Sequence, residues 1–238
     1  MYKVLITTSG TGSRLGVLTK DKNKALIEIK NKKVIDYIIQ SHNSQVELVI
    51  MIGYKGNQVR DYIQTRYTNR KITYICVEPY NGTGSSLGYS LLQAKNYVKC
   101  PFIFHCNDTI VKGYIPSPEK YNWNGIARKE ENEIYNPIRY STVLIKNNQI
   151  HKIQMKGAKS YDALHIGLVG IKNYENFWQI LEKEYKSNPN DSALNDVVVI
   201  SRMIENGVKF KAINYPEWHD TGSINSLVET EKELIFIQ

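Results

Sequence analysis

The chain has 238 residues and a formal net charge of +8, with 42% hydrophobic and 23% charged residues. This composition is ordinary for a globular protein and excludes collagen-like and intrinsically disordered chains. Its three cysteines lack C-x-x-C spacing, which excludes a disulfide framework and a cysteine-based zinc site.

The positive charge does not gather into one stripe. The densest group of lysines, between Lys20 and Lys33, is interrupted by apolar and polar residues, unlike a nucleic-acid-binding surface. The chain starts directly with a strand-like segment, and no apolar run approaches the ~18 residues of a membrane span. We therefore expect a cytoplasmic protein that binds an anionic small molecule and has neither a nucleic-acid nor a membrane partner.

Strand-like and helix-like segments alternate in the first part of the chain. Short runs rich in β-branched and aromatic residues predict strands at Lys3–Thr7, Glu47–Ile52, Ile72–Val77 and Pro101–Cys106. Amphipathic segments predict helices between them, at Lys33–Ser41, Asn57–Tyr67 and Gly84–Tyr97. This alternation predicts βαβ units in a mostly parallel sheet, which binds ligands at the carboxyl ends of its strands.

After Asp108 the pattern changes to half-exposed, alternating segments. They predict strands at Tyr121–Arg128, Tyr140–Lys146, Gln149–Met155, Ala163–Ile171 and Val208–Asn214. Helices are predicted at Tyr174–Tyr185 and Ser192–Asn206, and a last helix from near Ser223 to the C-terminus. Because no repeat or linker interrupts the chain, we expect residues 1–238 to form one α/β domain. It should be a Rossmann-like, three-layer α/β/α fold with a mostly parallel mixed sheet.

A glycine-rich turn follows the first predicted strand. Residues Thr8–Ser13 are small, and their glycines allow phosphate oxygens to approach backbone N–H groups. Arg14 and Lys24 add cations that can neutralise a triphosphate. The turn lacks the Gly-Lys-[Ser/Thr] of a P-loop, and Gly16 stands one position away from the dinucleotide-binding fingerprint. The sequence thus indicates a site for nucleotide phosphates that is neither a P-loop nor a dinucleotide-binding turn.

Two aspartates are candidates for a metal site. Asp108 follows the strand predicted at Pro101–Cys106, and Asp220 follows the one predicted at Val208–Asn214. Mg²⁺ binds one or two carboxylates together with substrate phosphates and water. A single aspartate is more often a turn or N-cap residue, so the metal site depends on the two meeting in the fold.

These segments together resemble the sugar-phosphate nucleotidyltransferase family, which has a Rossmann-like core of the GT-A type. The family's phosphate loop, lysine segment, G-T-[AG] segment, aspartate-ending strand, acceptor segment and W-x-D-x-G-[ST] motif occur in the same order. They are Leu5–Leu15, Asn23–Leu26, Gly82–Leu87, Cys106–Asp108, Met155–Gly157 and Trp218–Ser223. The resemblance covers nearly the whole chain, whose length is similar to that of short members such as phosphocholine, phosphonate and capsule cytidylyltransferases.

The resemblance implies a role for each matched residue. The triphosphate would bind the loop Thr8, Ser9, Gly10, Thr11, Gly12 and Ser13, and the nucleobase would contact Gly82, Thr83 and Gly84. Arg14 would bind the β- and γ-phosphates and Lys24 the α-phosphate, as catalytic residues. Asp108 and Asp220 would bind Mg²⁺, and Lys156 the acceptor phosphate. Residues 1–110 would then form the nucleotide-binding half and residues 111–238 the acceptor-binding half.

The implied activity transfers a nucleoside monophosphate from a nucleoside triphosphate to a phosphorylated or phosphonate acceptor and releases pyrophosphate. CTP is the favoured nucleotide and CMP the favoured group, with capsule or other surface-polysaccharide biosynthesis as the implied pathway. The chain departs from the family pattern at Thr8-Ser9, Asn23, Asn107 and Met155. Met155 replaces the glutamate of the acceptor segment, which opens the acceptor to molecules other than an ordinary hexose 1-phosphate.

Other interpretations stay open. Gly84–Gly88 spells the G-x-S-x-G of serine hydrolases, with His165 and His219 downstream, but the direct strand-to-helix turn and the oxyanion motif are missing. A glycosyltransferase would have a D-x-D, whereas Asp108 precedes Thr109-Ile110. Further alternatives are a sugar-1-phosphate guanylyl-, uridylyl- or thymidylyltransferase and a catalytically silent nucleotide-binding subunit.

The acceptor itself is not identified by these patterns. Tyr140 and Tyr161 fall near the expected acceptor wall, where aromatic rings could contact a quaternary ammonium. Scattered tyrosines more often cover the edges of a core. The sequence also indicates no oligomeric state.

Overall fold

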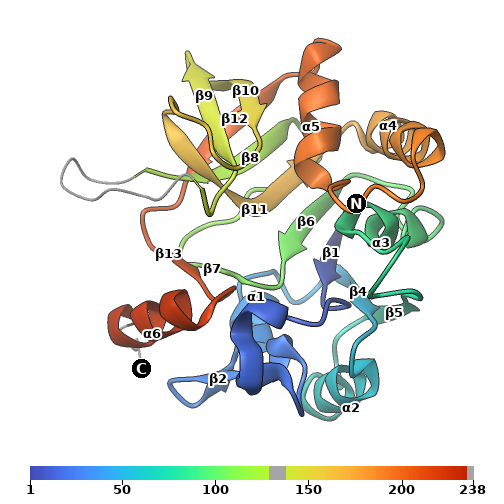
Figure 1. The fold of residues 1–238 in the computed structure, drawn as a ribbon, viewed down its shortest axis with the longest axis vertical. Coiled ribbons are helices and arrows are strands. Elements are labelled where there is room, and N and C mark those ends of the chain that lie inside the picture. The colour runs from blue at the N-terminus through green and yellow to red at the C-terminus, as the bar shows by residue number, and fades with distance from the viewer. Residues whose placement is uncertain (129–137, 235–238) are drawn as a thin grey trace.

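A mixed β-sheet runs through the molecule (Figure 1). The computed structural model describes residues 1–128 and 138–234. In these residues the sheet comprises β1 (Lys3–Thr7), β4 (Glu47–Ile52), β5 (Ile72–Cys76), β6 (Phe102–Cys106), β8 (Asn122–Ala127), β9 (Thr142–Lys146), β10 (Gln149–Gln154), β11 (Ala163–Ile171) and β12 (Phe210–Asn214). Their order is β5-β4-β1-β6-β11-β8-β12-β10-β9. Strands β5, β4, β1 and β6 run parallel, as do β8 and β12, whereas β11 is antiparallel to β6 and β8.

Helices and two short strand pairs complete the fold. The helices are α1 (Val34–Gln40), α2 (Gly56–Arg66), α3 (Leu87–Gln93), α4 (Tyr174–Ser187), α5 (Asp196–Glu205) and α6 (Ile224–Glu233), with 3-10 helices η1 (Ser13–Thr19) and η2 (Lys24–Leu26). The strand pairs are β2 (Glu28–Ile29) with β3 (Lys32–Lys33), and β7 (Thr109–Val111) with β13 (Trp218–Asp220). Across the described ranges, no helix has the length and apolar character needed to cross a membrane.

The two faces of the sheet have separate apolar cores. Leu5 and Met51 point to the face covered by α3, α4 and α5, while Ile6 and Ile50 pack with α1 and α2. Because β1 and β4 are covered on both faces, their sequences are nearly continuous apolar runs instead of alternating ones. The α/β class and the three-layer arrangement predicted from the sequence are therefore confirmed. The sheet is mixed but not mostly parallel, because β11 is antiparallel to β6, β8 and β9, and β10 is antiparallel to β9 and β12.

The predicted elements occur with adjusted ends. Helix α3 is shorter than the predicted Gly84–Tyr97, because its N-cap is Ser86, whose side chain accepts a hydrogen bond from Tyr89 N. Helix α5 begins at Asp196 and not at Ser192, because the N-cap is Asn195. The pairs β2–β3 and β7–β13 were not predicted, since strands of two or three residues carry no usable periodicity.

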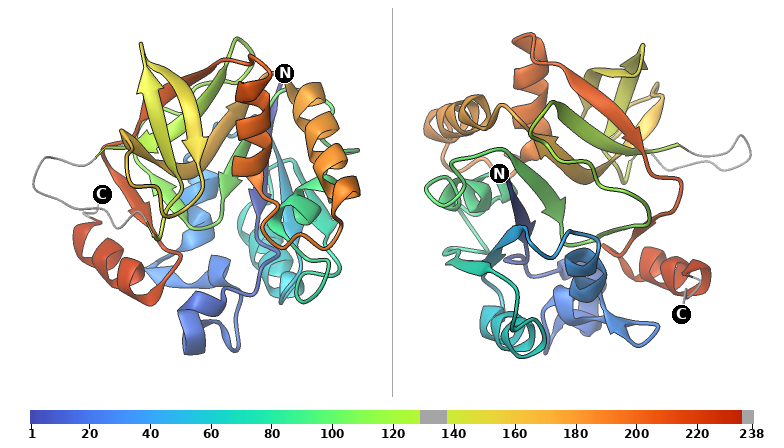
Figure 2. Two further views of the ribbon diagram at one scale, coloured as in Figure 1. Left: turned by 45° about the horizontal axis from the view of Figure 1, so that its top comes forward. Right: turned by 180° about the vertical axis from the view of Figure 1, so that it is seen from behind.

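The β7–β13 pair returns the end of the chain to the first half of the molecule. Its antiparallel register pairs Asp220 with Thr109, so Asp220 lies within a short strand instead of after β12. Figures 1 and 2 show α6, which follows, beside the first helical turns of the chain. Ser223 is the N-cap of α6, as predicted near this position, and the expected continuation beyond residue 234 lies outside the described residues.

Two buried histidines lie beneath the connection from β6 to β7. His105 Nε2 donates to the carbonyl of Thr109 at 2.9 Å, so His105 Nδ1 accepts from His42 Nε2 at 2.8 Å. Burial, and then the neighbouring His105, lower the pKa of His42 well below its usual value. Burial likewise lowers the pKa of His105 to about 4. Both rings are therefore neutral in the folded protein at neutral pH.

We expect the free energy of unfolding to fall as the pH drops from about 6.5 to about 4. In this window the unfolded chain protonates both histidines while the folded protein excludes the protons, and His105 alone accounts for ~3 kcal/mol. Below this window His105 is protonated in both the folded and the unfolded state, so it no longer makes the free energy of unfolding depend on pH. Urea unfolding at a series of pH values tests this. H105Q should flatten the dependence and the exposed-site control H151Q should not; equal slopes in all three proteins would contradict the prediction.

Candidate active site

A cleft of about 670 Å³ opens at the carboxyl ends of β1 and β6. Thr7 and Cys106, the last residues of these strands, lie at its base. Its lining comes from the loop after β1, the starts of α3 and α5, and residues of β11 and β13. Open α/β sheets bind their ligands at this position.

Most residues predicted from the sequence meet in this cleft. They are Ser9, Gly10, Thr11, Gly12, Ser13, Arg14, Lys24, Asp108, Lys156 and Asp220. The fold thus brings the glycine-rich loop, both candidate catalytic cations, both aspartates and the acceptor lysine to one place.

Four predicted nucleotide-binding residues are not among those that line the cleft, and their contact with a nucleotide stays a prediction. Thr8 is fully buried, and its hydroxyl donates to the carbonyl of Met51 at 2.7 Å, which anchors the base of the loop. Gly82, Thr83 and Gly84 form a turn outside the lining, and the residues that follow them, Ser85, Ser86 and Leu87, face the cleft. A turn with positive φ at Gly82 and Gly84 directs the chain outward before α3 begins.

The loop after β1 presents free donors. In the described ranges, the N–H groups of Gly10, Thr11 and Gly12 donate no hydrogen bond, which leaves them available to an anion. Gly12 has φ 68°, and a Cβ on it would come within 3.0 Å of Thr19 Cγ2 and 3.2 Å of Lys24 Cβ. Glycine therefore lets the loop close against the lysine segment.

Asn23 fixes the position of Lys24. It is fully buried, its Nδ2 donates to the carbonyl of Thr8 at 2.9 Å and to that of Tyr54 at 2.6 Å, and its Oδ1 accepts from Ala25 N at 2.9 Å. These three hydrogen bonds tie the lysine segment to the loop. Asn23, one of the departures from the family pattern, therefore has a structural role.

Asp108 and Asp220 come together in the cleft. The β7–β13 pairing continues into a bond from Thr221 N to the carbonyl of Asp108 at 2.9 Å. A Cβ placed on Gly222 would lie 3.1 Å from Asp108 Oδ2 and 3.0 Å from Asp220 Oδ1. The two carboxylates therefore flank the same small space, which the missing Gly222 side chain leaves open.

Positive side chains compensate these two carboxylates unequally in the described part of the chain. Lys24 Nζ lies 3.1 Å and Arg14 Nη2 3.6 Å from Asp108 Oδ2. Burial opposes ionisation of Asp108, but Lys24 and then Arg14 outweigh it and lower the pKa of Asp108. Burial, followed by the charge of Asp108, raises the pKa of Asp220, although Gly222 N and Tyr140 Oη donate to its oxygens at 2.8 Å and 3.0 Å.

The carboxylate pair fits a hard divalent cation. The raised pKa of Asp220 means that the second anion is poorly compensated, and a cation between the two would supply the missing charge. The structure shows, for residues 1–128 and 138–234, no group of three or more His, Cys, Asp or Glu side chains able to hold a metal by itself. Two carboxylates, with phosphate and water completing the shell, are the coordination that Mg²⁺ accepts.

The G-x-S-x-G segment is a helix start. Ser86 Oγ accepts from Tyr89 N, and Ser85 Oγ donates to the carbonyl of Gly82 at 2.7 Å. A Cβ on Gly88 would stand 2.3 Å from Leu194 Cγ, so this glycine permits close packing against the segment before α5. Neither serine has a histidine partner in the part of the chain that the structure describes, which removes the basis for a serine hydrolase.

Some residues that line the cleft were not assigned to the site from the sequence. Arg139, His165, Asp196 and Trp218 line it together with Tyr140, whereas Tyr161 does not. His165 had been considered only as a hydrolase residue. The sequence did not indicate a site role for Asp196, because acidic residues are commonly found in the first turn of a helix.

The family of this chain is assigned from a family model that matches half of its residues. The model described as nucleotidyl transferase matches residues 3–121, which include the glycine-rich loop, Lys24 and Asp108. Together with the α/β core and the carboxylate-lined cleft, this defines a protein of the nucleotide-transferring class. The chain belongs to the nucleotidyl transferase family.

Relatives with different names match this chain over most of its length. The bifunctional protein GlmU of Methanococcus vannielii is 28% identical over 223 residues, covering 92% of this chain but 51% of the relative. The CTP:phosphoglutamine cytidylyltransferase of Campylobacter jejuni is 23% identical over 242 residues, covering 94% of this chain and 87% of the relative. The chain thus spans about half the length of GlmU relatives.

A solved structure extends the likeness to the whole fold. The CTP:phosphocholine cytidylyltransferase of Streptococcus pneumoniae superposes with a TM-score of 0.79 at 16% identity and covers 98% of this chain and 99% of that one. At this identity the likeness concerns the fold alone. It includes the segments of the second half that the family match does not reach.

Proposed function

We propose that this protein transfers a nucleoside monophosphate from a nucleoside triphosphate to a phosphorylated or phosphonate acceptor and releases pyrophosphate. The observation that carries the proposal is the convergence of Lys24, Arg14, Asp108 and Asp220 beside a loop with free N–H groups. The chain's family membership supports the same activity.

The two halves of the chain would supply different parts of the reaction. The loop, Arg14 and Lys24 lie in residues 1–110 and would bind the triphosphate, while Lys156 lies in residues 111–238 and would meet the acceptor phosphate. Asp108 and Asp220 come from both halves, so the reacting phosphates would meet where the halves join. Holding two polyanions in line at one place is the main catalytic task.

The chemistry is an in-line substitution at phosphorus. An oxygen of the acceptor phosphate forms a bond to the α-phosphorus, and the bond from the α-phosphorus to the oxygen that bridges to the β-phosphorus breaks. Pyrophosphate leaves with that oxygen. Because the acceptor oxygen is already ionised, no general base is needed, and Lys24 and Arg14 neutralise charge that develops on the phosphates.

Asp108 and Asp220 are the residues that would hold Mg²⁺. The ion would supply Lewis-acid stabilisation of phosphate charge. Lys24 pairs with Asp108 in the structure and also faces the loop, so it can exchange this carboxylate for a phosphate oxygen when the nucleotide binds.

CTP is the nucleotide that we favour, with CMP as the transferred group. The support is by analogy: both the Campylobacter jejuni relative and the Streptococcus pneumoniae structure are named for CTP. Transfer to a sugar 1-phosphate from another nucleotide is the second candidate. A role of the product in surface-polysaccharide assembly stays a prediction of the sequence resemblance.

Pyrophosphate release tests the proposal directly. The protein is incubated with Mg²⁺, each of the four common nucleoside triphosphates, and sugar 1-phosphates, phosphocholine, 2-aminoethylphosphonate or phospho-amino acids. We expect acceptor-dependent release with one triphosphate, CTP, and loss of release when EDTA removes the metal. Tight binding of a triphosphate without release for any pair would contradict the activity and support a silent nucleotide-binding subunit.

A further inference from the structure

Two buried histidines contact the strand pair that brings Asp108 and Asp220 together. His105, near the end of β6, and His42, which follows α1, are 0% and 6% exposed. Their rings meet edge to face with their centres 5.0 Å apart. The proposed chemistry uses neither residue. Their connection to the site is one backbone carbonyl, that of Thr109, which follows Asp108 directly.

The pairing of β7 with β13 directs the Thr109 carbonyl away from both strands. The N–H group of Thr221 donates to the carbonyl of Asp108 at 2.9 Å, so these opposed residues form a hydrogen-bonded pair. Hydrogen-bonded and non-hydrogen-bonded pairs alternate in an antiparallel ladder. The next pair, Thr109 with Asp220, is therefore of the second kind, and its carbonyls point outward.

Donors from other elements hold the two outward carbonyls. Thr230 Oγ1, on α6, donates to the carbonyl of Asp220 at 2.9 Å. His105 Nε2 donates to the carbonyl of Thr109, also at 2.9 Å. Because Thr109 is buried, loss of the histidine would leave an unpaired carbonyl inside the protein, which is costly. His105 thus holds β7 at the residue next to Asp108.

His42 stabilises the form of His105 that can make this bond. Burial lowers the pKa of both rings, so at neutral pH each ring is neutral and has one N–H group. A carbonyl only accepts, which places the hydrogen of His105 on Nε2 and leaves Nδ1 as an acceptor. His42 Nε2 donates to this Nδ1 at 2.8 Å.

We infer that His105, in the tautomer that His42 stabilises, is a positioning residue for the divalent cation. By holding the Thr109 carbonyl, it keeps Asp108 at the distance from Asp220 that a cation between them requires. The inference rests on the proposed function, in which these carboxylates hold Mg²⁺. Both carboxylates flank one small space, so a shift of β7 relative to β13 would change its width. Replacing residues that orient metal ligands typically weakens metal binding by about ten- to a hundredfold.

Two variants of His105 separate the hydrogen bond from the volume of the ring. H105L fills the space but leaves the Thr109 carbonyl without its donor, whereas the side-chain amide of H105Q can donate in place of Nε2. H105Q therefore serves as the conservative variant that should restore metal binding.

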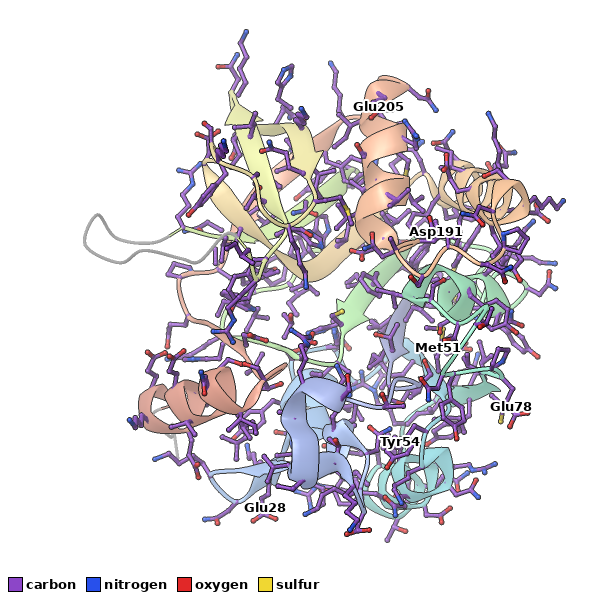
Figure 3. The ribbon with its side chains drawn as sticks, viewed as in Figure 1. Glu28, Met51, Tyr54, Glu78, Asp191 and Glu205 are labelled. Carbon is purple, nitrogen blue, oxygen red and sulfur yellow. The ribbon has the colours of Figure 1, made fainter. Side chains whose placement is uncertain are left out.

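Two further variants are matched controls outside the cleft. Trp178 Nε1 donates to the buried carbonyl of Val98 at 2.8 Å, so W178F also removes a ring N–H group from a buried carbonyl. Neither residue is among those that line the cleft in the described ranges. E205Q tests for cations bound at exposed acids, and Figure 3 labels Glu205 at the far end of α5.

The first measurement is the affinity for Mn²⁺, without nucleotide and with CTP. Mn²⁺ is the probe because its effect on the relaxation of water protons increases when the ion binds a protein. We expect H105L to bind Mn²⁺ at least about tenfold more weakly than the wild type, and H105Q, W178F and E205Q to bind it like the wild type. Thermal unfolding should show comparable losses of stability in H105L and W178F, since each leaves one buried carbonyl unpaired.

The second measurement identifies the tautomers in the wild-type protein and needs no variant. Long-range 1H–15N spectra distinguish a protonated ring nitrogen from an unprotonated one. We expect both His42 and His105 to carry their hydrogen on Nε2 at neutral pH. A hydrogen on Nδ1 of His105 would overturn the inference whether or not H105L folds, because that tautomer cannot donate to Thr109.

The outcomes separate the inference from the proposed function. Weaker Mn²⁺ binding in H105L, with wild-type binding in H105Q and W178F, supports the inference even when no pyrophosphate is released, in which case the proposed activity alone fails. Wild-type binding in H105L, or equal weakening in H105L and either H105Q or W178F, overturns the inference and leaves the activity standing. Absence of Mn²⁺ binding in the wild type also overturns it, and pyrophosphate release then tests the activity by itself.

Discussion

Replacing Asp108 with asparagine is expected to lower the rate of pyrophosphate release by about a thousandfold or more. Asparagine keeps the shape but removes the charge that pairs with Lys24 and Arg14 and that would share Mg²⁺ with Asp220. Burial is the main cause of the raised pKa of Asp220, and the same substitution removes the second cause, the charge of Asp108, so the chain should still fold. The measurement is kcat with the preferred triphosphate and acceptor, together with thermal unfolding.

Two control variants test whether this loss of rate is specific to the carboxylate site. E28Q removes an exposed acid outside the cleft and should leave kcat unchanged. S86A removes the N-cap of α3 and should cost about 1 kcal/mol of stability with little change in rate, because Ser86 is a capping residue. The reverse pattern, with D108N active and S86A inactive, would restore the serine-hydrolase interpretation and contradict the carboxylate site.

Replacing Gly222 with alanine is expected to lower activity by about a hundredfold without unfolding the protein. The new methyl group would stand 3.1 Å from Asp108 Oδ2, 3.0 Å from Asp220 Oδ1 and 3.0 Å from Arg14 Nη2. It would therefore fill the space between the carboxylates and push them apart. Titration with Mg²⁺ should show a higher metal concentration for half-maximal activity, and this shift identifies the cause.

The matched control for this variant is G56A. A Cβ on Gly56, in α2, would meet Ile52 Cβ at 2.9 Å, so the crowding is similar but lies outside the cleft. We expect G56A to lower the unfolding temperature and to keep its dependence on Mg²⁺. Wild-type activity and metal dependence in G222A would show that the two aspartates do not act together.

Both expectations rest on one feature of the site, its unequal charge compensation. Asp108 has two cations nearby, whereas Asp220 accepts from neutral donors, the Tyr140 hydroxyl and the N–H group of Gly222. A cation added beside Asp220 is favourable for this reason. A triphosphate brings the opposite charge to the loop side, so nucleotide and metal should bind cooperatively.

Local patterns in the sequence determined the layered core and the part of the cleft formed by the loop after β1 and by Asp108. The strands Lys3–Thr7 and Glu47–Ile52 are apolar on both faces and can only be buried in a covered sheet. The small residues after β1 and Asp108 after β6 follow strand ends directly, so chain order alone places them at one edge of the sheet. Local chemistry was sufficient there because each residue is adjacent to a long, strongly patterned element.

Tertiary structure decided the rest of the site, because it depends on contacts between distant segments. The β7–β13 pair, with only Thr109–Val111 and Trp218–Asp220, has no periodicity that a sequence could show, yet its register brings Asp220 to Asp108. The open space at Gly222 and the pairing of His165 with Asp196 likewise exist only after β11, α5 and β13 have packed together. The residues next to a side chain in the sequence indicate its local structure. Which other side chains it contacts depends on the register and packing of elements far away in the sequence.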